Sequence, residues 1–252
     1  MCYSDWVSAN MNKRKQTMNY FITGTSNGLG RALAEQGLAQ GNQVFGLSRS
    51  GFDGSHPSYQ EVQCDLTELE TLPGYLDTLL KGVDKLDLVI LNAGILGPIT
   101  NMTDCRVGDL EATMTTNLWA NKVILDWLYQ QSIEVDQMVL ISSGAAVNGS
   151  KGWAGYALSK AALNMLTQLY AHEFESSHLC ALAPGLVDTA MQAFISDPKC
   201  IDIAQFPSFS RLREARSMGK MPTSEEVARD ILGKLVLFKT FPSGAFIDIR
   251  NL

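Results

Sequence analysis

The stretch Thr23-Gly24-Thr25-Ser26-Asn27-Gly28-Leu29-Gly30 lies between a short apolar run at 18–23 and a helical pattern at 28–39. Glycines in such a turn let the backbone bend sharply and approach a pyrophosphate closely. The helix that follows presents free N–H groups and the positive end of its dipole to the phosphates. A glycine-rich turn alone is weak evidence, because an ordinary strand–turn–helix connection can also be rich in glycine. Its position between the first strand and a helix favours a dinucleotide-binding site.

Short apolar runs alternate with helical stretches along the rest of the chain. Strands that are apolar on both sides and alternate with helices indicate a parallel sheet covered on both faces. The fold class that we predict is α/β, a single-domain Rossmann-type doubly wound parallel sheet of about seven strands with helices on both faces. Its ligands are expected at the carboxyl ends of the strands. We expect strands at 18–23, 43–48, 62–66, 86–92, 137–143, 179–184 and 245–249, and helices at 28–39, 108–131, 154–175 and 224–238.

Two segments do not fit this alternation. Residues 1–17 have no apolar core, so they are not a secretory signal, and we expect a flexible extension before a domain at 18–252. Residues 187–222 mix proline, lysine, phenylalanine and serine without one clear period, and we interpret them as a mobile flap over the site.

The bulk composition excludes several function classes. The chain has 26 acidic and 20 basic residues, and its net charge of −6 argues against nucleic acid as a partner. No apolar run reaches the roughly 18 residues that a membrane span needs. The five cysteines are odd in number and none are spaced C-x-x-C, which argues against a disulfide framework or a metal site. We therefore expect a cytoplasmic protein that binds no metal, no membrane and no nucleic acid.

The end of the second strand indicates which nucleotide fits. An acidic residue there usually binds the ribose of NAD, but this chain has Leu47-Ser48-Arg49-Ser50. Arg49 can hold a 2′-phosphate through a planar, two-pronged contact, with Ser48 or Ser50 adding hydrogen bonds. The alternative is that Arg49 is an ordinary surface charge. The pattern favours NADP(H) over NAD(H).

Two further strand ends complete this part of the site. Asp65 ends the third predicted strand, where it can hydrogen-bond the adenine. Asn92-Ala93-Gly94 ends the fourth, where a small glycine leaves room for the cofactor.

A second group of residues carries the chemistry. Tyr156 and Lys160 are four apart, so both lie on one face of a helix. An ammonium group beside a phenol lowers the phenol's pKa of about 10 and suits it to general acid catalysis. Ser143, at the end of the fifth strand, can hydrogen-bond a carbonyl oxygen as negative charge develops on it. A tyrosine four residues before a lysine is common on helices, so the pair gains meaning only together with Ser143 and the glycine-rich turn.

Taken together, these motifs resemble the short-chain dehydrogenase/reductase family. The match consists of T-G-x-x-x-G-x-G at 23–30, N-A-G at 92–94, Asn117, Ser143, Y-x-x-x-K at 156–160 and P-G at 184–185. The resemblance implies that Tyr156 is the acid, that Ser143 polarises the carbonyl and that Lys160 holds the nicotinamide ribose. It also implies that Asn117 holds a water that relays protons to Lys160, and that Thr189 contacts the nicotinamide amide. The implied cofactor-binding residues are Gly24, Ser26, Asn27, Gly28, Leu29, Gly30, Arg49, Asp65, Leu66, Asn92, Ala93, Gly94, Tyr156, Lys160, Pro184, Gly185, Val187 and Thr189.

The chain departs from the family pattern at two positions. Position 91 is leucine where the family often has asparagine, and we expect little effect. Asn27 stands where NADP-dependent members often carry a basic residue. Arg49 is then the obvious clamp for the 2′-phosphate, so we expect a weaker NADP preference than usual.

A narrower resemblance, to the sepiapterin reductases and the bacterial benzil reductases, concerns the substrate. It rests on segments 141–163, 183–192 and 243–249, and it implies a vicinal dicarbonyl substrate, an α-diketone or a pterin-like compound. In sepiapterin reductases the acid matching Asp248 anchors the pterin. Benzil reductases also keep an acid there, so a structural or dimer role for Asp248 stays open.

The residues around the predicted acid indicate the shape of the substrate pocket. Gly144 and Ala145 leave space above the nicotinamide, and Trp153 can form an aromatic wall. The flap brings Met191 and three phenylalanines, which suits an apolar carbonyl compound. The alternative is that Phe206 and Phe209 pack the flap on itself.

Other functions remain open. The carbonyl can belong to another class, such as a 3-oxoacyl thioester or a sugar ketone. A non-catalytic NADPH-sensing regulator is a further alternative, against which the intact Ser143, Tyr156 and Lys160 argue. The resemblance also implies a homodimer, or a homotetramer, paired through the two long helices at 108–131 and 154–175.

Overall fold

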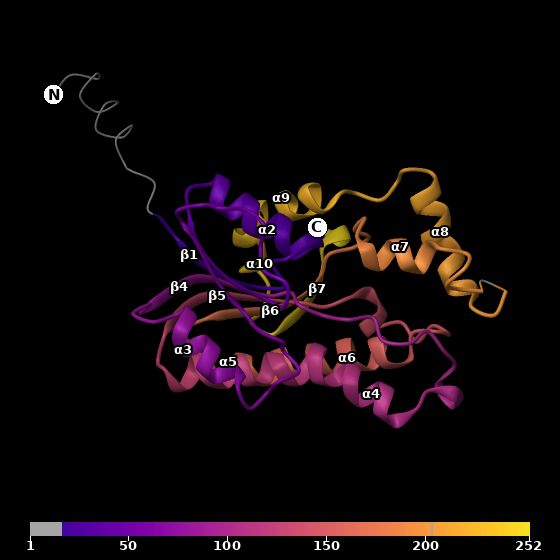
Figure 1. Cartoon of the computed structure of the whole chain (residues 1–252), viewed down its shortest axis with the longest axis horizontal. Coiled ribbons are helices and arrows are strands. Elements are labelled where there is room, and N and C mark those ends of the chain that lie inside the picture. Colours follow the sequence, from indigo (N-terminus) through magenta and orange to yellow (C-terminus); the bar gives the residue numbers. More distant parts are fainter. Residues whose placement is uncertain (1–16, 203) are drawn as a thin grey trace, which may run out of the picture.

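Seven strands form one parallel sheet in the order β3-β2-β1-β4-β5-β6-β7 (Figure 1). The computed structural model describes residues 17–202 and 204–252, so the predicted extension lies almost entirely outside the described residues. Because β1 pairs with both β2 and β4, the strand order reverses beside β1, where such sheets bind ligands. The strands are β1 (Asn19–Thr23), β2 (Gln43–Ser48), β3 (Tyr59–Gln63), β4 (Lys85–Leu91), β5 (Glu134–Ile141), β6 (His178–Ala183) and β7 (Ala245–Asp248).

Helices cover both faces of this sheet, as the apolar strands predicted. On one face lie α2 (Gly28–Ala39), α9 (Ser224–Gly233) and α10 (Leu235–Phe238), and on the other α3 (Leu72–Leu79), α5 (Ala120–Gln130) and α6 (Ala154–Glu173) (Figure 1). Successive side chains of a strand point to opposite faces. Accordingly, Ile22 belongs to the core beneath α2 and α9, and Phe21 to the core beneath α3 and α5.

The first predicted long helix contains an irregularity. It runs as α4 (Val107–Met114), a π-helical turn (Thr115–Trp119) and α5, so the predicted helix at 108–131 is present but locally widened. Such turns often occur at functional sites, and Asn117 lies inside this one. The helix predicted at 224–238 ends earlier, at Gly233, and a short α10 follows it. Thr223 and Glu226 form the capping box that starts α9.

The prediction for the third strand was wrong in position. Apolar Val62, Cys64 and Leu66 indicated 62–66, but β3 covers Tyr59–Gln63 and pairs only with β2. An edge strand tolerates polar, half-exposed side chains, so hydrophobicity does not mark it. Asp65 therefore follows the strand instead of ending it, and its carboxylate accepts hydrogen bonds from the backbone and side chain of Thr67.

Segment 187–222 contains more regular structure than the flap prediction had. It includes α7 (Ala190–Ser196), a 3₁₀ turn (Pro207–Phe209) and α8 (Ser210–Ser217), which lie together at one end of the sheet (Figure 1). Their lengths of seven and eight residues are too short to show a clear period. The mobility that we predicted for segment 187–222 stays a prediction.

Helix α3 was missed because its first turn contains Pro73 and Gly74. Proline is tolerated there, since the first N–H groups of a helix have no partner within it. Within the part of the chain that the structure describes, no helix is both long and apolar enough to cross a membrane.

Candidate active site

The glycine-rich turn is tightly bound to the end of β4. Thr23 Oγ1 accepts hydrogen bonds from the backbone N–H groups of Asn92 and Ala93, and Asn92 Nδ2 donates to the Thr23 carbonyl at 3.0 Å. A Cβ built on Gly30 would lie 2.2 Å from the Gly24 carbonyl oxygen, so no side chain fits there. Gly24 has a φ of +78°, a conformation that favours glycine. The turn is thus a bare backbone cradle, which fits the pyrophosphate of a dinucleotide.

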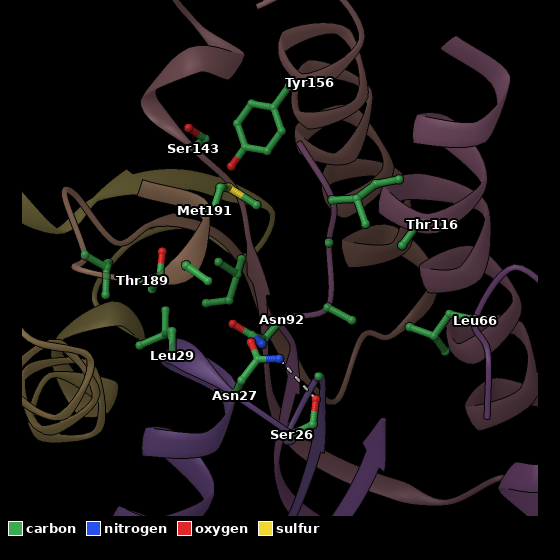
Figure 2. Close-up of a pocket in the computed structure, with 18 of the residues that line it drawn as sticks. Ser26, Asn27, Leu29, Leu66, Asn92, Thr116, Ser143, Tyr156, Thr189 and Met191 are labelled. Atoms are coloured by element: carbon green, nitrogen blue, oxygen red, sulfur yellow. Dashed lines mark hydrogen bonds between the residues drawn. The ribbon is translucent and has the colours of Figure 1, made fainter. Parts of the chain in front are cut away.

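A cavity of about 460 Å³ extends from this cradle across the carboxyl ends of the strands (Figure 2). Its volume is in the range of small-molecule and cofactor sites. Most of the predicted site residues line it: Gly24, Ser26, Asn27, Gly28, Leu29, Arg49, Asp65, Leu66, Asn92, Ala93, Gly94, Ser143, Trp153, Tyr156, Lys160, Pro184, Gly185, Val187, Thr189 and Met191.

Five predicted residues are not among those that line the cavity. Gly30 packs behind the cradle, and Asn117 lies behind Gly94. Gly144 and Ala145 form a 3₁₀ turn directly after Ser143, and Asp248 ends β7 beside the cavity. Sequence reasoning in turn missed Ile95, Ala112, Thr116, Gln192 and Ile195, which do line it. Ile95 follows the N-A-G motif directly, which is the one signal that pointed to it.

The nucleotide end of the cavity carries Arg49 and Asp65. The carboxylate of Asp65 accepts two hydrogen bonds from Thr67, and these, with a smaller contribution from the charge of Arg49, lower the pKa of Asp65. Asp65 is thus anionic at neutral pH, and its contact with an adenine stays a prediction. Arg49 is exposed at the cavity wall between Ser48 and Ser50. The Arg49 side chain is therefore accessible from the cavity.

Ser143 and Tyr156 lie at the opposite end of the cavity, near each other (Figure 2). Ser143 follows β5, and Tyr156 lies in the first turn of α6. Burial raises the pKa of Tyr156, and a hydrogen bond with Ser143 partly opposes this shift. The net shift is upward, so the lowering that we predicted from Lys160 is wrong for this structure, because burial of the phenol has the larger effect. The two hydroxyls can act together on one carbonyl oxygen.

Lys160 is almost fully buried, one helical turn after Tyr156. Its Nζ donates a 2.7 Å hydrogen bond to the Ile141 carbonyl and lies 5.9 Å from the centre of the Tyr156 ring. Burial lowers the pKa of Lys160 to about 8, because a charged ammonium is poorly solvated there. Lys160 is therefore mostly charged at pH 7 and becomes neutral in mildly alkaline solution.

Asn117 is buried in the π-helical turn and organises the loop after β4. Its side chain accepts from the Ile95 N–H at 2.8 Å, and donates to the Ile95 carbonyl and to Ser159 Oγ at 2.9 Å each. A Cβ on Gly94 would lie 3.1 Å from Asn117 Oδ1 and 3.4 Å from Lys160 Nζ, so the bare backbone of Gly94 lies close to both groups. The water relay to Lys160 stays a prediction.

The flap meets the site through Trp153. The Trp153 ring stacks on Phe209 at 4.7 Å between centroids and lies 5.6 Å from the Tyr156 ring. Phe206 and Phe209 are buried with Ile195 in an apolar cluster and do not line the cavity, as expected if they pack the flap on itself. The cluster also includes Trp153, so it packs the flap against the loop before α6 as well. Trp153 and Met191 provide the apolar wall beside Tyr156.

The described residues contain no group of three or more histidine, cysteine or acidic side chains that could hold a metal ion. The site is therefore a glycine cradle joined by one cavity to a serine, a tyrosine and a buried lysine. This arrangement fits a dinucleotide cofactor and a proton donor for a carbonyl.

Comparisons with known proteins agree with these features. Residues 19–199 match the family model for short chain dehydrogenase. A benzil reductase ((S)-benzoin forming) from Bacillus subtilis (strain 168) is 34% identical over 244 residues, which cover 92% of this chain and 98% of that protein. A sepiapterin reductase from Rattus norvegicus is 30% identical over 257 residues, 92% and 95% of the two chains. The crystal structure of the KRED1-Pglu enzyme shares the fold, with a TM-score of 0.80 and 24% identity over 92% of this chain and 100% of that one.

Proposed function

The chain belongs to the short-chain dehydrogenase family, and we propose that it uses NADPH to reduce one carbonyl of an α-diketone or of a pterin-like vicinal dicarbonyl. Family membership makes it an oxidoreductase that uses a nicotinamide cofactor. Its similarity to benzil reductase and sepiapterin reductase supports carbonyl reduction. The observation that carries the proposal is the meeting of the Ser143 and Tyr156 hydroxyls at the end of the cavity away from Arg49.

In the proposed reaction, the two hydroxyls bind the oxygen of the carbonyl that is reduced. Ser143 donates a hydrogen bond that stabilises the negative charge developing on this oxygen. When bound, the cofactor supplies a hydride to the carbonyl carbon. Tyr156 then gives its proton to the oxygen, which completes the alcohol and leaves a phenolate. The ammonium of Lys160, one turn along α6, stabilises that phenolate.

Arg49 supports NADPH over NADH. It is exposed at the cavity wall, and the residues beside it, Ser48 and Ser50, are hydroxyl-bearing instead of acidic. A 2′-phosphate gains charge-assisted hydrogen bonds from a guanidinium group, whereas the 2′-hydroxyl of NADH has no carboxylate at the end of β2 to bind. We expect NADPH to be the better cofactor, by a margin reduced by the neutral Asn27.

The test follows NADPH absorbance against a panel of benzil, 1-phenyl-1,2-propanedione, sepiapterin, a sugar ketone and an acetoacetyl thioester. We expect turnover of the dicarbonyls, and slower turnover with NADH. Tyr156→Phe removes the proton donor and should lower kcat by about 10²- to 10⁴-fold. The same variant should weaken NADPH binding far less than it lowers kcat, because its ring still fills the site.

Three results would count against the proposal. Turnover of the thioester or the sugar ketone alone would reassign the substrate class. Normal kcat in Tyr156→Phe would remove Tyr156 from its role as the acid. Tight NADPH binding without turnover of any carbonyl would favour a sensor in place of an enzyme.

A further inference from the structure

Arg250 lies against Gly185, which lines the cavity, although no sequence motif points to it. Asp248 ends β7 in register with Ala183 of β6, directly before the Pro184-Gly185 turn that lines the cavity. The stem of Arg250 crosses this turn, because a Cβ built on Gly185 would lie 3.2 Å from Arg250 Cγ.

The guanidinium group of Arg250 reaches the backbone beside Ser143. A Cβ built on Gly144 would lie 3.4 Å from Arg250 Nη2 and would meet no other atom within 4 Å. Gly144 is the residue that follows Ser143. A cationic donor group therefore lies near the residue next to Ser143, whose hydroxyl binds the carbonyl in the proposed reaction.

The carboxylate of Asp248 is already occupied by Arg250. Arg250 Nε donates to Asp248 Oδ1 at 2.8 Å and Nη2 donates to Oδ2 at 2.5 Å, while the Arg250 backbone N–H also donates to Oδ1. The Asp248 side chain is 13% exposed, whereas that of Arg250 is 58% exposed. A substrate that approaches this pair meets the guanidinium group, and the amino groups of a pterin-like compound find no free carboxylate.

The N–H groups of Arg250 that do not bind Asp248 favour a substrate with a hydrogen-bond acceptor. Nη1 has no hydrogen-bond partner among the described residues, and a guanidinium group can donate but cannot accept. Because Asp248 cancels the charge of Arg250, the pair attracts an anion only weakly. A neutral oxygen acceptor, such as a second carbonyl, matches this surface better than a carboxylate does.

We propose that Arg250 is a specificity residue that binds the second carbonyl oxygen of a vicinal diketone while Ser143 and Tyr156 bind the first. In such a compound the two oxygens lie on adjacent carbons, and the guanidinium group of Arg250 lies near Gly144, the residue that follows Ser143. This inference rests on the proposed function, and it chooses the diketone over the pterin-like alternative.

The experiment compares 1-phenyl-1,2-propanedione with 1-phenyl-1-propanone and 1-phenyl-2-propanone, which each lack one of the two carbonyls. The monoketones are measured as substrates or as competitive inhibitors. Arg250→Met keeps the stem but removes the donors, and we expect kcat/KM for the diketone to fall about tenfold or more, since hydrogen bonds to charged groups are strong. The values for the monoketones should change by less than about twofold, because they lose no contact with Arg250.

Two further variants separate recognition from structure. Arg250→Lys keeps a donor and should retain part of the diketone preference. The double variant Asp248→Asn/Arg250→Met leaves no unpaired carboxylate and should show the same loss of preference as Arg250→Met. NADPH Kd and Tm should be unchanged in the double variant.

The outcomes distinguish this inference from the proposed function. An equal fall for the diketone and the monoketones in Arg250→Met would mean that Arg250 only supports the Gly185 turn, and would overturn the inference alone. A marked preference of the wild-type protein for phenylglyoxylate over the diketone would overturn the assignment of a neutral acceptor. Failure of the wild-type protein to reduce any carbonyl would overturn the proposed function and this inference with it.

Discussion

Lys160 shows how one buried residue links the site to the stability of the fold. Among the residues that the structure describes it has no acidic partner, and its Nζ donates to the carbonyl of Ile141 at the end of β5. Keeping an uncompensated ammonium in this position costs free energy, which is why burial brings the pKa of Lys160 down to about 8. The residue that stabilises the phenolate in the proposed reaction therefore destabilises the folded protein near neutral pH.

This cost has a pH dependence that can be measured. Between the folded pKa of about 8 and the ordinary value of 10.5, the unfolded chain binds more protons at Lys160 than the folded protein does, so stability rises with pH. Urea denaturation of the wild type and of Lys160→Met should show this difference. From pH 7 to pH 9.5, we expect the free energy of unfolding of the wild type to rise by about 2 kcal/mol relative to the variant.

The comparison with Lys160→Met cancels titrations common to both proteins. Burial raises the pKa of Cys64 to about 11 and that of Cys180 to about 12, which lowers stability at alkaline pH in both proteins alike. The lost hydrogen bond to Ile141 shifts the curve of the variant by a nearly constant amount. Parallel stability curves would show that the ammonium of Lys160 is not destabilised by burial.

The flap and the loop before α6 form one packed element at the substrate end. Gly152 has a φ of +94°, and a Cβ there would lie 2.7 Å from a ring carbon of Phe209 and 2.9 Å from one of Phe206. Trp153 then stacks on Phe209 and contacts Tyr156. The position of the flap thus depends on the close packing of Phe206 and Phe209 against Gly152, the residue before Trp153.

Adding one methyl group should disturb this element. In Gly152→Ala the methyl group overlaps both phenylalanine rings and the backbone is strained, so we expect a loss of about 1–3 kcal/mol in the free energy of unfolding. The displaced Trp153 should also raise KM for aromatic diketones more than it lowers kcat. Gly149→Ala is the matched control, because a Cβ there meets no atom within 4 Å. Equal stability and KM in the two variants would contradict this account of the flap.

At the scale of the molecule, an apolar stripe lies on the outer side of α6. Leu158, Met165 and Leu169 are exposed at helical spacing on α6, and Trp119 is exposed on the neighbouring π-helical turn. Contiguous exposed apolar side chains of this kind often mark interfaces. We propose that two copies of the chain pair here, through α5 and α6 of each, as a homodimer.

A charge in this stripe should separate the copies. Leu169→Glu places a carboxylate in the proposed interface, so we expect a shift from twice the mass of one chain to a single mass in sedimentation equilibrium. Val236→Glu is the control, because Val236 is the most exposed large apolar residue among the described ones and lies on α10, across the sheet. Dissociation by Val236→Glu and not by Leu169→Glu would place the contact between copies at α10 and contradict an interface at α6. A wild-type tetramer reduced to a dimer by Val236→Glu would add a second interface at α10.

Sequence alone determined what depends on neighbours along the chain. The alternation of apolar runs and helices predicted the doubly wound sheet, and the spacing of four placed Tyr156 and Lys160 on one face of α6. Thr223 and the acids after it marked the start of α9. These features are encoded locally, because helix and strand periodicity decide which side chains share a face.

Contacts between residues that are distant in the sequence could not be predicted and appear only in the folded protein. The position of the edge strand β3 is set by its pairing with β2, and the apolar residues that predicted a strand at 62–66 did not record this pairing. Phe209 stacks on Trp153, although the two residues are far apart in the sequence. Arg250 pairs with Asp248 and lies near Gly144, a contact that no local sequence pattern predicts. Strand register and side-chain packing fix such contacts, and both depend on the whole folded chain. The glycine cradle at one end of the cavity is built from short motifs and was predictable from them. The surroundings of Ser143 and Tyr156 include side chains that only the packed sheet brings together.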